Sequence, residues 1–247
     1  MKRRALLIGG PGQPGKNYLS GVERDLANYR AFLCSELGGA WVNGEITSLL
    51  SPTESDVTVA MDRLKDADYS FTVFTGHSFY FEFLKSTMVA LQEDVHMSCR
   101  DLRMGAKRHT LILDGYRVSE TAKNLDPLAN ADRAMPENKG LFCRQHFANQ
   151  IELCPRGLVV LHACDNEQQS AGDIPNKGGR YSLSLLDAAR NWFTTSKVSA
   201  RSGSDTLTIV DAHRAAADTV RSWSSIRQDP WIELPESGPY FPFAFLG

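Results

Sequence analysis

The stretch Tyr69-Ser70-Phe71-Thr72-Val73-Phe74-Thr75-Gly76-His77-Ser78 contains the clearest strand of the sequence and the polar turn that follows it. Residues 69–74 are mostly apolar and aromatic, which predicts a buried strand. A second apolar run, residues 110–113, leads into Asp114-Gly115-Tyr116-Arg117, and a third, residues 157–163, leads into residues 164–171. In open α/β sheets, ligands bind at the carboxyl ends of the strands, so we look for function at these three ends.

The rest of the chain repeats the alternation of short apolar runs with amphipathic stretches that is typical of strand–helix–strand units. Strands are expected at residues 5–8, 46–50, 69–74, 110–113 and 157–163, with a closing edge strand at 240–245 that contains Pro242. Helices are expected at residues 22–37, 54–64, 141–153, 181–193 and 206–223, helical character at 99–104, and a surface loop at 121–139. The sequence therefore predicts one α/β domain over residues 1–247, with a mostly parallel sheet of roughly six strands and helices on both faces.

Composition excludes several classes of protein. The 247 residues are 42% hydrophobic, which suffices for one sizeable core, and 27 basic against 29 acidic side chains give a net charge of −2. Such a balance produces no field that attracts nucleic acid or a membrane surface, so neither partner is expected. The apolar run at residues 5–8 is too short for a signal peptide, and the five cysteines are scattered without metal-ligand spacing. We therefore expect a cytoplasmic protein without disulfides or zinc.

In order and separation, the three strand ends resemble those of the caspase-like peptidases, especially the bacterial metacaspase or orthocaspase relatives. Thr75-Gly76-His77-Ser78 is similar to the Ser-Gly-His-Gly motif that carries the catalytic histidine of this family. Asp114 matches the Asp of the Asp-x-Cys-His-Ser-Gly motif, and Tyr116 stands where that motif has its nucleophilic cysteine. Residues 164–171 resemble Cys-Lys-Asp-Asp-Gln-Thr-Ser-Ala, with Asn166 and Glu167 at the paired acids.

Two further stretches extend the resemblance over nearly the whole chain. Residues 19–26 resemble the Leu-x-Gly-x-x-Asn-Asp-Ala segment that opens the first helix of the family, and residues 228–230 and 241–244 resemble the closing segment of bacterial members. The resemblance implies a caspase-hemoglobinase fold. It also implies, for active members, cleavage after basic residues by a His–Cys dyad, sometimes with calcium, although the residues themselves indicate no calcium site.

The departures from the family motif point to a disabled enzyme. A phenol has a pKa of about 10, so Tyr116 cannot supply the thiolate nucleophile, and Arg117-Val118-Ser119 replaces the His-Ser-Gly next to the oxyanion donors. His77 is then either the family's general base or a partner of the Tyr116 hydroxyl. The prediction is a binding, scaffolding or regulatory module with a protein or peptide partner. Asp114, Asn166 and Glu167 would form an acidic pocket for an Arg or Lys side chain, unless Asp114 only caps its strand or pairs with Arg117.

Two alternatives remain open. The chain could be an active cysteine-type endopeptidase whose nucleophile is another residue, with Cys164 and Ser119 as candidates that also have ordinary structural roles. Residues 10–17, from Gly10 to Asn17, nearly satisfy the phosphate-binding pattern G-x-x-x-x-G-K-[ST], which would indicate an NTP-binding protein. Against this reading, two prolines remove N–H donors from the loop, and the helix is expected only after residue 21.

Overall fold

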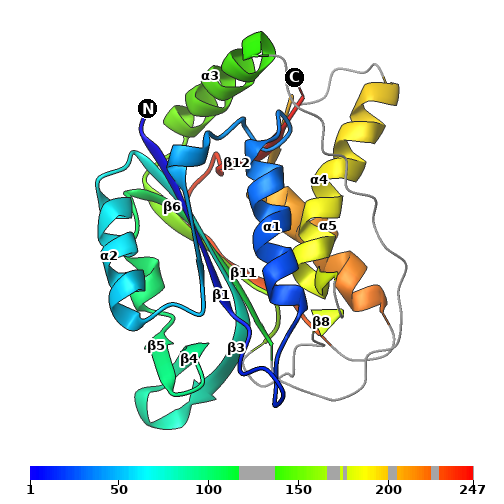
Figure 1. Cartoon of the computed structure of the whole chain (residues 1–247). Coiled ribbons are helices and arrows are strands. Elements are labelled where there is room, and N and C mark those ends of the chain that lie inside the picture. The colour runs from blue at the N-terminus through cyan, green and yellow to red at the C-terminus, as the bar shows by residue number, and fades with distance from the viewer. Residues whose placement is uncertain (117–136, 166–172, 175–176, 200–204, 224–227, 247) are drawn as a thin grey trace.

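The computed structural model describes residues 1–116, 137–165, 173–174, 177–199, 205–223 and 228–246 (Figure 1). Within them, the main sheet has the strand order β11-β7-β6-β3-β1-β2. Five of these six strands are parallel, and β11 is antiparallel to β7. The strands are β1 (Arg3–Gly10), β2 (Ile46–Leu50), β3 (Tyr69–Phe81), β6 (Arg108–Tyr116), β7 (Gly157–His162) and β11 (Trp231–Glu233). The predicted α/β fold with a mostly parallel sheet is confirmed.

Helices cover both faces of this sheet (Figure 1). The face that we call the α1/α4 face carries α1 (Gly21–Cys34), α4 (Arg180–Ser199) and α5 (Ile209–Ser222), and α3 (Glu137–Leu153) closes the same core where β1 begins. The opposite face, the α2 face, carries α2 (Glu54–Lys65), whose start is fixed by a capping box between Thr53 and Asp56. None of the helices in the described part of the chain is long and apolar enough to cross a membrane.

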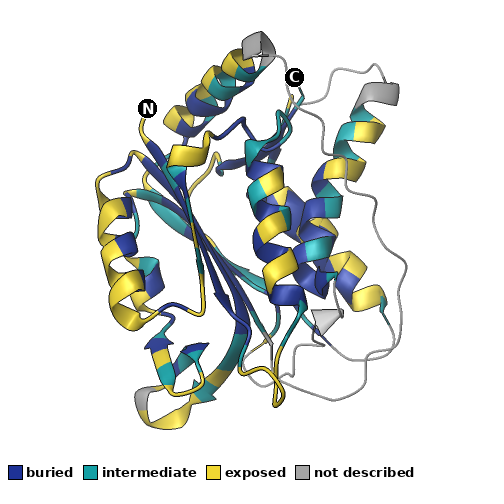
Figure 2. Ribbon diagram, viewed as in Figure 1, coloured by how far each residue is buried: buried dark blue, intermediate teal, exposed yellow. Residues whose placement is uncertain are grey.

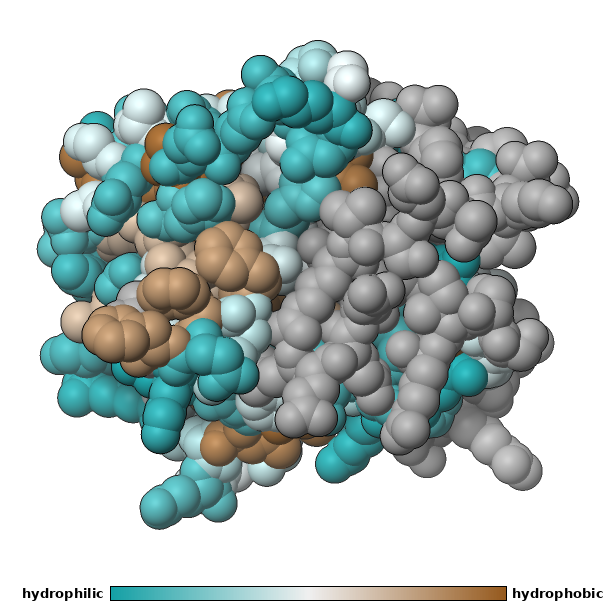
Figure 3. All heavy atoms as spheres, turned by 90° about the horizontal axis from the view of Figure 1, so that it is seen from below, coloured by the Kyte–Doolittle hydropathy of each residue, from teal (hydrophilic) through white to brown (hydrophobic). Residues whose placement is uncertain are grey.

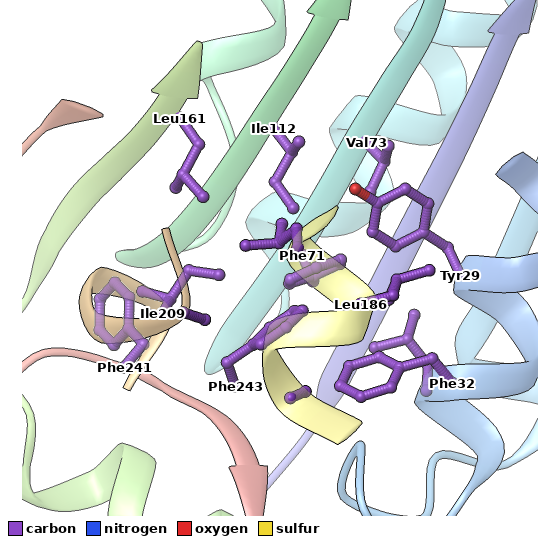
Figure 4. Close-up of a cluster of buried hydrophobic side chains, with 14 of the residues drawn as sticks. Tyr29, Phe32, Phe71, Val73, Ile112, Leu161, Leu186, Ile209, Phe241 and Phe243 are labelled. Atoms are coloured by element: carbon purple, nitrogen blue, oxygen red, sulfur yellow. The ribbon is translucent and has the colours of Figure 1, made fainter. Parts of the chain in front are cut away.

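Side chains alternate between the two faces along each strand, which gives each face its own core. Phe71 and Val73 point toward the α1/α4 face, and Phe74 points toward the α2 face. Figure 4 shows the larger core, where aromatic rings from α1, β3 and the C-terminal segment interdigitate. Burial of the sheet between the helices leaves mainly outer helix surfaces and loops exposed (Figure 2). The same alternation decides toward which face each side chain at the strand ends points.

The sequence did not predict the hairpin that extends β3. Beyond Gly76, β3 leaves its parallel neighbours and pairs antiparallel with β4 (Ser86–Gln92), which pairs with β5 (Val95–Ser98). Two short 3-10 helices, η2 (Glu82–Leu84) and η3 (Asp101–Arg103), flank the hairpin, and a third, η1 (Asn43–Glu45), precedes β2. Only η3 falls where residues 99–104 suggested a helix.

Three other predictions needed correction. The closing strand β12 (Pro242–Phe245) pairs with β10 (Thr206–Thr208) in a separate two-stranded sheet, because Phe241 and Phe243 pack into the core under the helices. The edge strand of the main sheet is instead β11. Residues 206–208 form β10 rather than the start of a helix, and residues 137–139 of the expected surface loop belong to α3, whereas 121–136 lie outside the described residues. A last short pair joins β8 (Asp173–Ile174) to β9 (Gly178–Gly179).

Candidate functional site at the strand ends

The ends of β3 and β6 lie side by side, as the sequence predicted for its first two polar turns. The parallel register places Thr75 beside Asp114 and His77 beside Tyr116. Tyr116 is the last described residue of β6, and only its backbone is described. The two positions singled out as base and former nucleophile therefore face each other across neighbouring strands.

The imidazole of His77 is held by a backbone carbonyl. Its Nε2 lies 2.7 Å from the carbonyl oxygen of Asn17, in the loop between β1 and α1. A carbonyl oxygen only accepts hydrogen bonds, so Nε2 carries the proton, and Nδ1 is the ring nitrogen to which no described residue donates. The ring is partly exposed, so Nδ1 is the atom of this site that can take up a proton from a ligand.

Gly12 makes this contact sterically possible. It has a φ of +85°, and a Cβ at this position would lie 2.8 Å from Nε2 of His77 and 2.7 Å from Oδ1 of Asn17. A side chain would therefore push the loop away from the imidazole. The sequence pattern of this loop suggests only a phosphate-binding candidate. Gly12 is the residue of the loop that signals how closely the loop approaches His77.

The same loop does not form a phosphate cradle. The backbone N–H groups of Lys16 and Asn17 both donate to the carbonyl of Gln13, and the Gln13 N–H donates to Oδ1 of Asn17. The Lys16 ammonium pairs with Glu93, and α1 begins at Gly21 rather than at Lys16. Because a phosphate site needs free N–H donors at a helix N-terminus, the loop geometry speaks against the NTP-binding alternative.

Asp114 is completely buried on the α1/α4 face of the sheet. Its Oδ2 accepts hydrogen bonds from the backbone N–H of Ser182 at 3.0 Å and from the Ser182 hydroxyl at 2.6 Å, both at the start of α4. Burial raises the pKa of this carboxyl to about 6, although the Ser182 donors act in the opposite direction. Its Oδ1 is also buried and has no hydrogen-bond partner among the described residues. Asp114 thus anchors α4 and retains one unused acceptor.

A second buried carboxylate, Asp25, belongs to the same network and was not predicted. The Thr75 hydroxyl donates to its Oδ2 at 2.7 Å, and the backbone N–H of Gly179 donates to both carboxylate oxygens at about 3 Å. The hydroxyl of Tyr29 reaches Ser182, and burial followed by the charges of Asp114 and Asp25 raises the pKa of Tyr29 well above its usual value. An acidic residue on the buried side of α1 was the sequence signal that could have identified Asp25.

The remaining candidates do not gather around His77. Asn166, Glu167 and Ser119 lie outside the described residues. Cys164 lines a hollow of about 390 Å³, counted out to the open solvent, together with Ser78, Gly115 and Asp165. Apolar residues of the α2-face core also line this hollow, which places Cys164 beside the other face of the sheet from Asp114. In the described part of the chain, Cys164 therefore lies toward the α2 face, whereas His77 lies on the side of Asp114.

The described ranges, which omit part of two strand-end loops, hold no cluster of three or more His, Cys, Asp or Glu side chains suited to a metal ion. The residues present at the site therefore give no support for the calcium that the resemblance allows, and no chemical step is derived through it.

Comparison with known proteins identifies the architecture. No family model matches the sequence, and no curated protein matches it. The fold is similar to that of the Drosophila initiator caspase Dronc, with a TM-score of 0.51 and 10% identity over 94% of this chain and 78% of that one. It is likewise similar to caspase-1 from Spodoptera frugiperda, with a TM-score of 0.52 and 12% identity over 94% of this chain and 86% of that one. At this level of identity the shared property is the fold, and the chain has a caspase-like fold.

Proposed function

We propose that this protein is a catalytically disabled relative of the metacaspases that acts as a binding, scaffolding or regulatory module in the cytoplasm. Its ligand is a protein or peptide segment that carries an exposed Arg or Lys. One observation carries the proposal: Tyr116 occupies the position of β6 that pairs with His77, where the family motif has its cysteine. A base without a thiolate partner cannot start cysteine-peptidase chemistry.

The unused acceptor of Asp114 supports the proposed ligand. Among the described residues, this buried carboxylate accepts only from the uncharged groups of Ser182 and has no compensating cation, and a guanidinium or ammonium would supply one with charge-assisted hydrogen bonds. Because the Asp114 side chain has no exposed surface, a ligand reaches Oδ1 only when the chain around it moves. Asn166 and Glu167 are proposed to complete the pocket.

A second candidate is an active endopeptidase that cleaves after Arg or Lys through a nucleophile still to be identified. The specific observation in its favour is the hydrogen bond from His77 Nε2 to the Asn17 carbonyl, which leaves Nδ1 as the ring nitrogen that would act as a general base. The two candidates predict the same ligand and differ in whether it is cut.

Binding is tested with a fluorescein-labelled peptide that contains one arginine, and with the same peptide carrying citrulline, its neutral isostere. Wild type should bind the arginine peptide more tightly, and Asp114→Asn should abolish that preference while a matched exposed change, Asp62→Asn on α2, should not. Thermal denaturation establishes that each variant is folded. Equal binding of the two peptides by wild type would refute the proposal without relying on any substitution.

A further inference from the structure

The hairpin that extends β3 exposes three phenylalanines within five residues. The exposed fractions are 37% for Phe79, 44% for Phe81 and 87% for Phe83, and the rings of Phe81 and Phe83 lie 6.4 Å apart. Figure 3 views the molecule from the side of the strand ends and shows apolar side chains gathered on this face. We call these three residues the phenylalanine hairpin. Exposed apolar clusters of this kind on soluble proteins usually mark an interaction site.

The phenylalanine hairpin continues the surface on which the candidate site lies. Side chains alternate along β3, and Phe71 and Val73 point toward the α1/α4 face, so Thr75, His77, Phe79 and Phe81 follow on that same side. Thr75 contacts Asp25 and lies beside Asp114 in the register. Along this side of β3, the buried carboxylate of Asp114 is therefore followed by the imidazole of His77 and then by the rings of Phe79 and Phe81.

The charges around the hairpin restrict what covers it. Residues 77–101 contain four acidic side chains and two basic ones. Of these acids, Glu93 forms an ion pair with Lys16 of the β1–α1 loop. The small excess of acidic side chains in this segment disfavours an anionic lipid surface and favours a ligand that combines apolar with basic side chains.

From these observations we infer that the ligand of the proposed site is an extended peptide segment whose apolar side chains lie on Phe79 and Phe81 while its basic side chain reaches Asp114. At about 3.3 Å per residue, Phe79 and Phe81 lie roughly 13 and 20 Å along β3 from the level of Asp114. An extended segment that runs along the strand spans these distances with apolar residues four and six positions from the basic one. The inference rests on the proposed function and adds the substrate or partner class to it.

The test uses fluorescence anisotropy with wild-type protein and three labelled peptides of glycine and serine. The first has one arginine followed by leucines four and six positions later, the second has the reverse order, and the third has serines in place of the leucines. One of the leucine peptides should bind about tenfold more tightly than the serine peptide, because two partly buried leucines contribute roughly 1 to 2 kcal/mol. Phe79→Ser/Phe81→Ser should remove this advantage and leave binding of the serine peptide unchanged.

The matched control is Leu141→Ser/Phe142→Ser on α3, which removes two apolar side chains that are 66% and 64% exposed at the other end of the sheet. This variant should keep the leucine preference. The inference is wrong if wild type binds leucine and serine peptides equally, or if the hairpin variant keeps the leucine preference. In either case, a remaining preference for arginine over citrulline would leave the proposed function intact. If the leucine peptide binds equally well when citrulline replaces its arginine, the proposed function is wrong, and the inference is wrong with it. If no peptide binds, the proposed function and the inference are both wrong.

Discussion

Two carboxylates, one on each face of the sheet, show how differently the fold treats the same chemical group. Asp114 is buried on the α1/α4 face, where its donors among the described residues are the uncharged groups of Ser182, and burial raises its pKa to about 6. Glu233 lies on the α2 face, about one third exposed, where two nitrogens of Arg103 and Nε2 of His162 contact it. The hydrogen bonds from Arg103 are the main reason that its pKa falls to about 2.

The difference lies in whether the protein itself supplies the cation. Glu233 is neutralised by its own chain and clamps β11 to η3, so it has little left to offer a ligand. Asp114 has no such partner in the described chain, and the same face carries His77. A cationic ligand is therefore expected on the α1/α4 face and not in the hollow on the α2 face. The following predictions test this contrast.

The largest effect is expected at Asp25, the fully buried carboxylate of the α1/α4 face. Asp25→Ala leaves the Thr75 hydroxyl and the Gly179 N–H without their acceptor, which should lower the free energy of unfolding by about 3 kcal/mol. Urea denaturation measures the change, with exposed Asp62→Ala as the control. A loss below about 1 kcal/mol would show that the buried network does not hold α1 and α4 to the sheet.

The loop that holds His77 is tested with a pair of glycines that have nearly the same backbone conformation. Gly12 and Gly15 have φ values of +85° and +83°, but a Cβ at Gly15 meets no atom within 4 Å. Both changes to alanine should cost about 1 kcal/mol for the backbone, and Gly12→Ala should cost about 1 kcal/mol more and shift the NMR signals of the His77 ring. Equal costs and an unmoved His77 signal would contradict the contact.

The two carboxylates of the comparison should give pH dependences of opposite sign. The pKa of Asp114 rises on folding from 3.8 to about 6, so between these values the folded state binds more protons and its stability falls as pH rises. The pKa of Glu233 falls on folding from 4.5 to about 2, so its contribution is present above 4.5 and is lost as pH falls toward 2. The stability of wild type relative to Asp114→Asn should therefore fall from pH 4 to 6, and relative to Glu233→Gln it should rise from pH 2 to 4.5. Denaturation over this pH range measures both, and slopes of the same sign would refute the contrast.

The smallest effect is expected for Glu233→Gln at neutral pH. Its ion pair with Arg103 is partly exposed on both sides and screened by solvent, so the loss of stability should stay below about 1 kcal/mol, well under what the full pKa shift of Glu233 would give without screening. Urea denaturation in low and high salt measures it. A loss above about 2 kcal/mol would mean that the α2-face clamp matters as much as the buried network.

Much of this architecture was readable from the sequence because strongly apolar runs alternate with amphipathic helices. Strand 46–50 and the start of α2 at residue 54 were located correctly, since local signals such as the Thr53 cap decide them. The β4–β5 hairpin was missed because its residues mix polar and apolar types without a clean period. The position of β12 was wrong because the aromatic packing that draws it away from the main sheet joins residues distant in sequence.

The candidate site was only partly predictable for the same reason. His77, Asp114 and Tyr116 follow strands, so their meeting at one edge follows from parallel topology. The partners that define their chemistry do not: the carbonyl of Asn17, the Ser182 donors and the Asp25 carboxylate come from loops and helices that tertiary packing brings to the sheet. That Cys164 lies on the other face of the sheet from Asp114 was likewise not predictable, because it depends on the register of β7 with β6.

The central claim is that the caspase-like fold persists here without a peptidase nucleophile. It is tested most directly by assaying purified wild type, Tyr116→Cys and His77→Ala against Arg and Lys peptide substrates, with and without calcium. We predict no cleavage by wild type under any condition, because Tyr116 cannot supply a thiolate. Cleavage by wild type that is lost in His77→Ala would contradict the claim and establish an active peptidase with a different nucleophile.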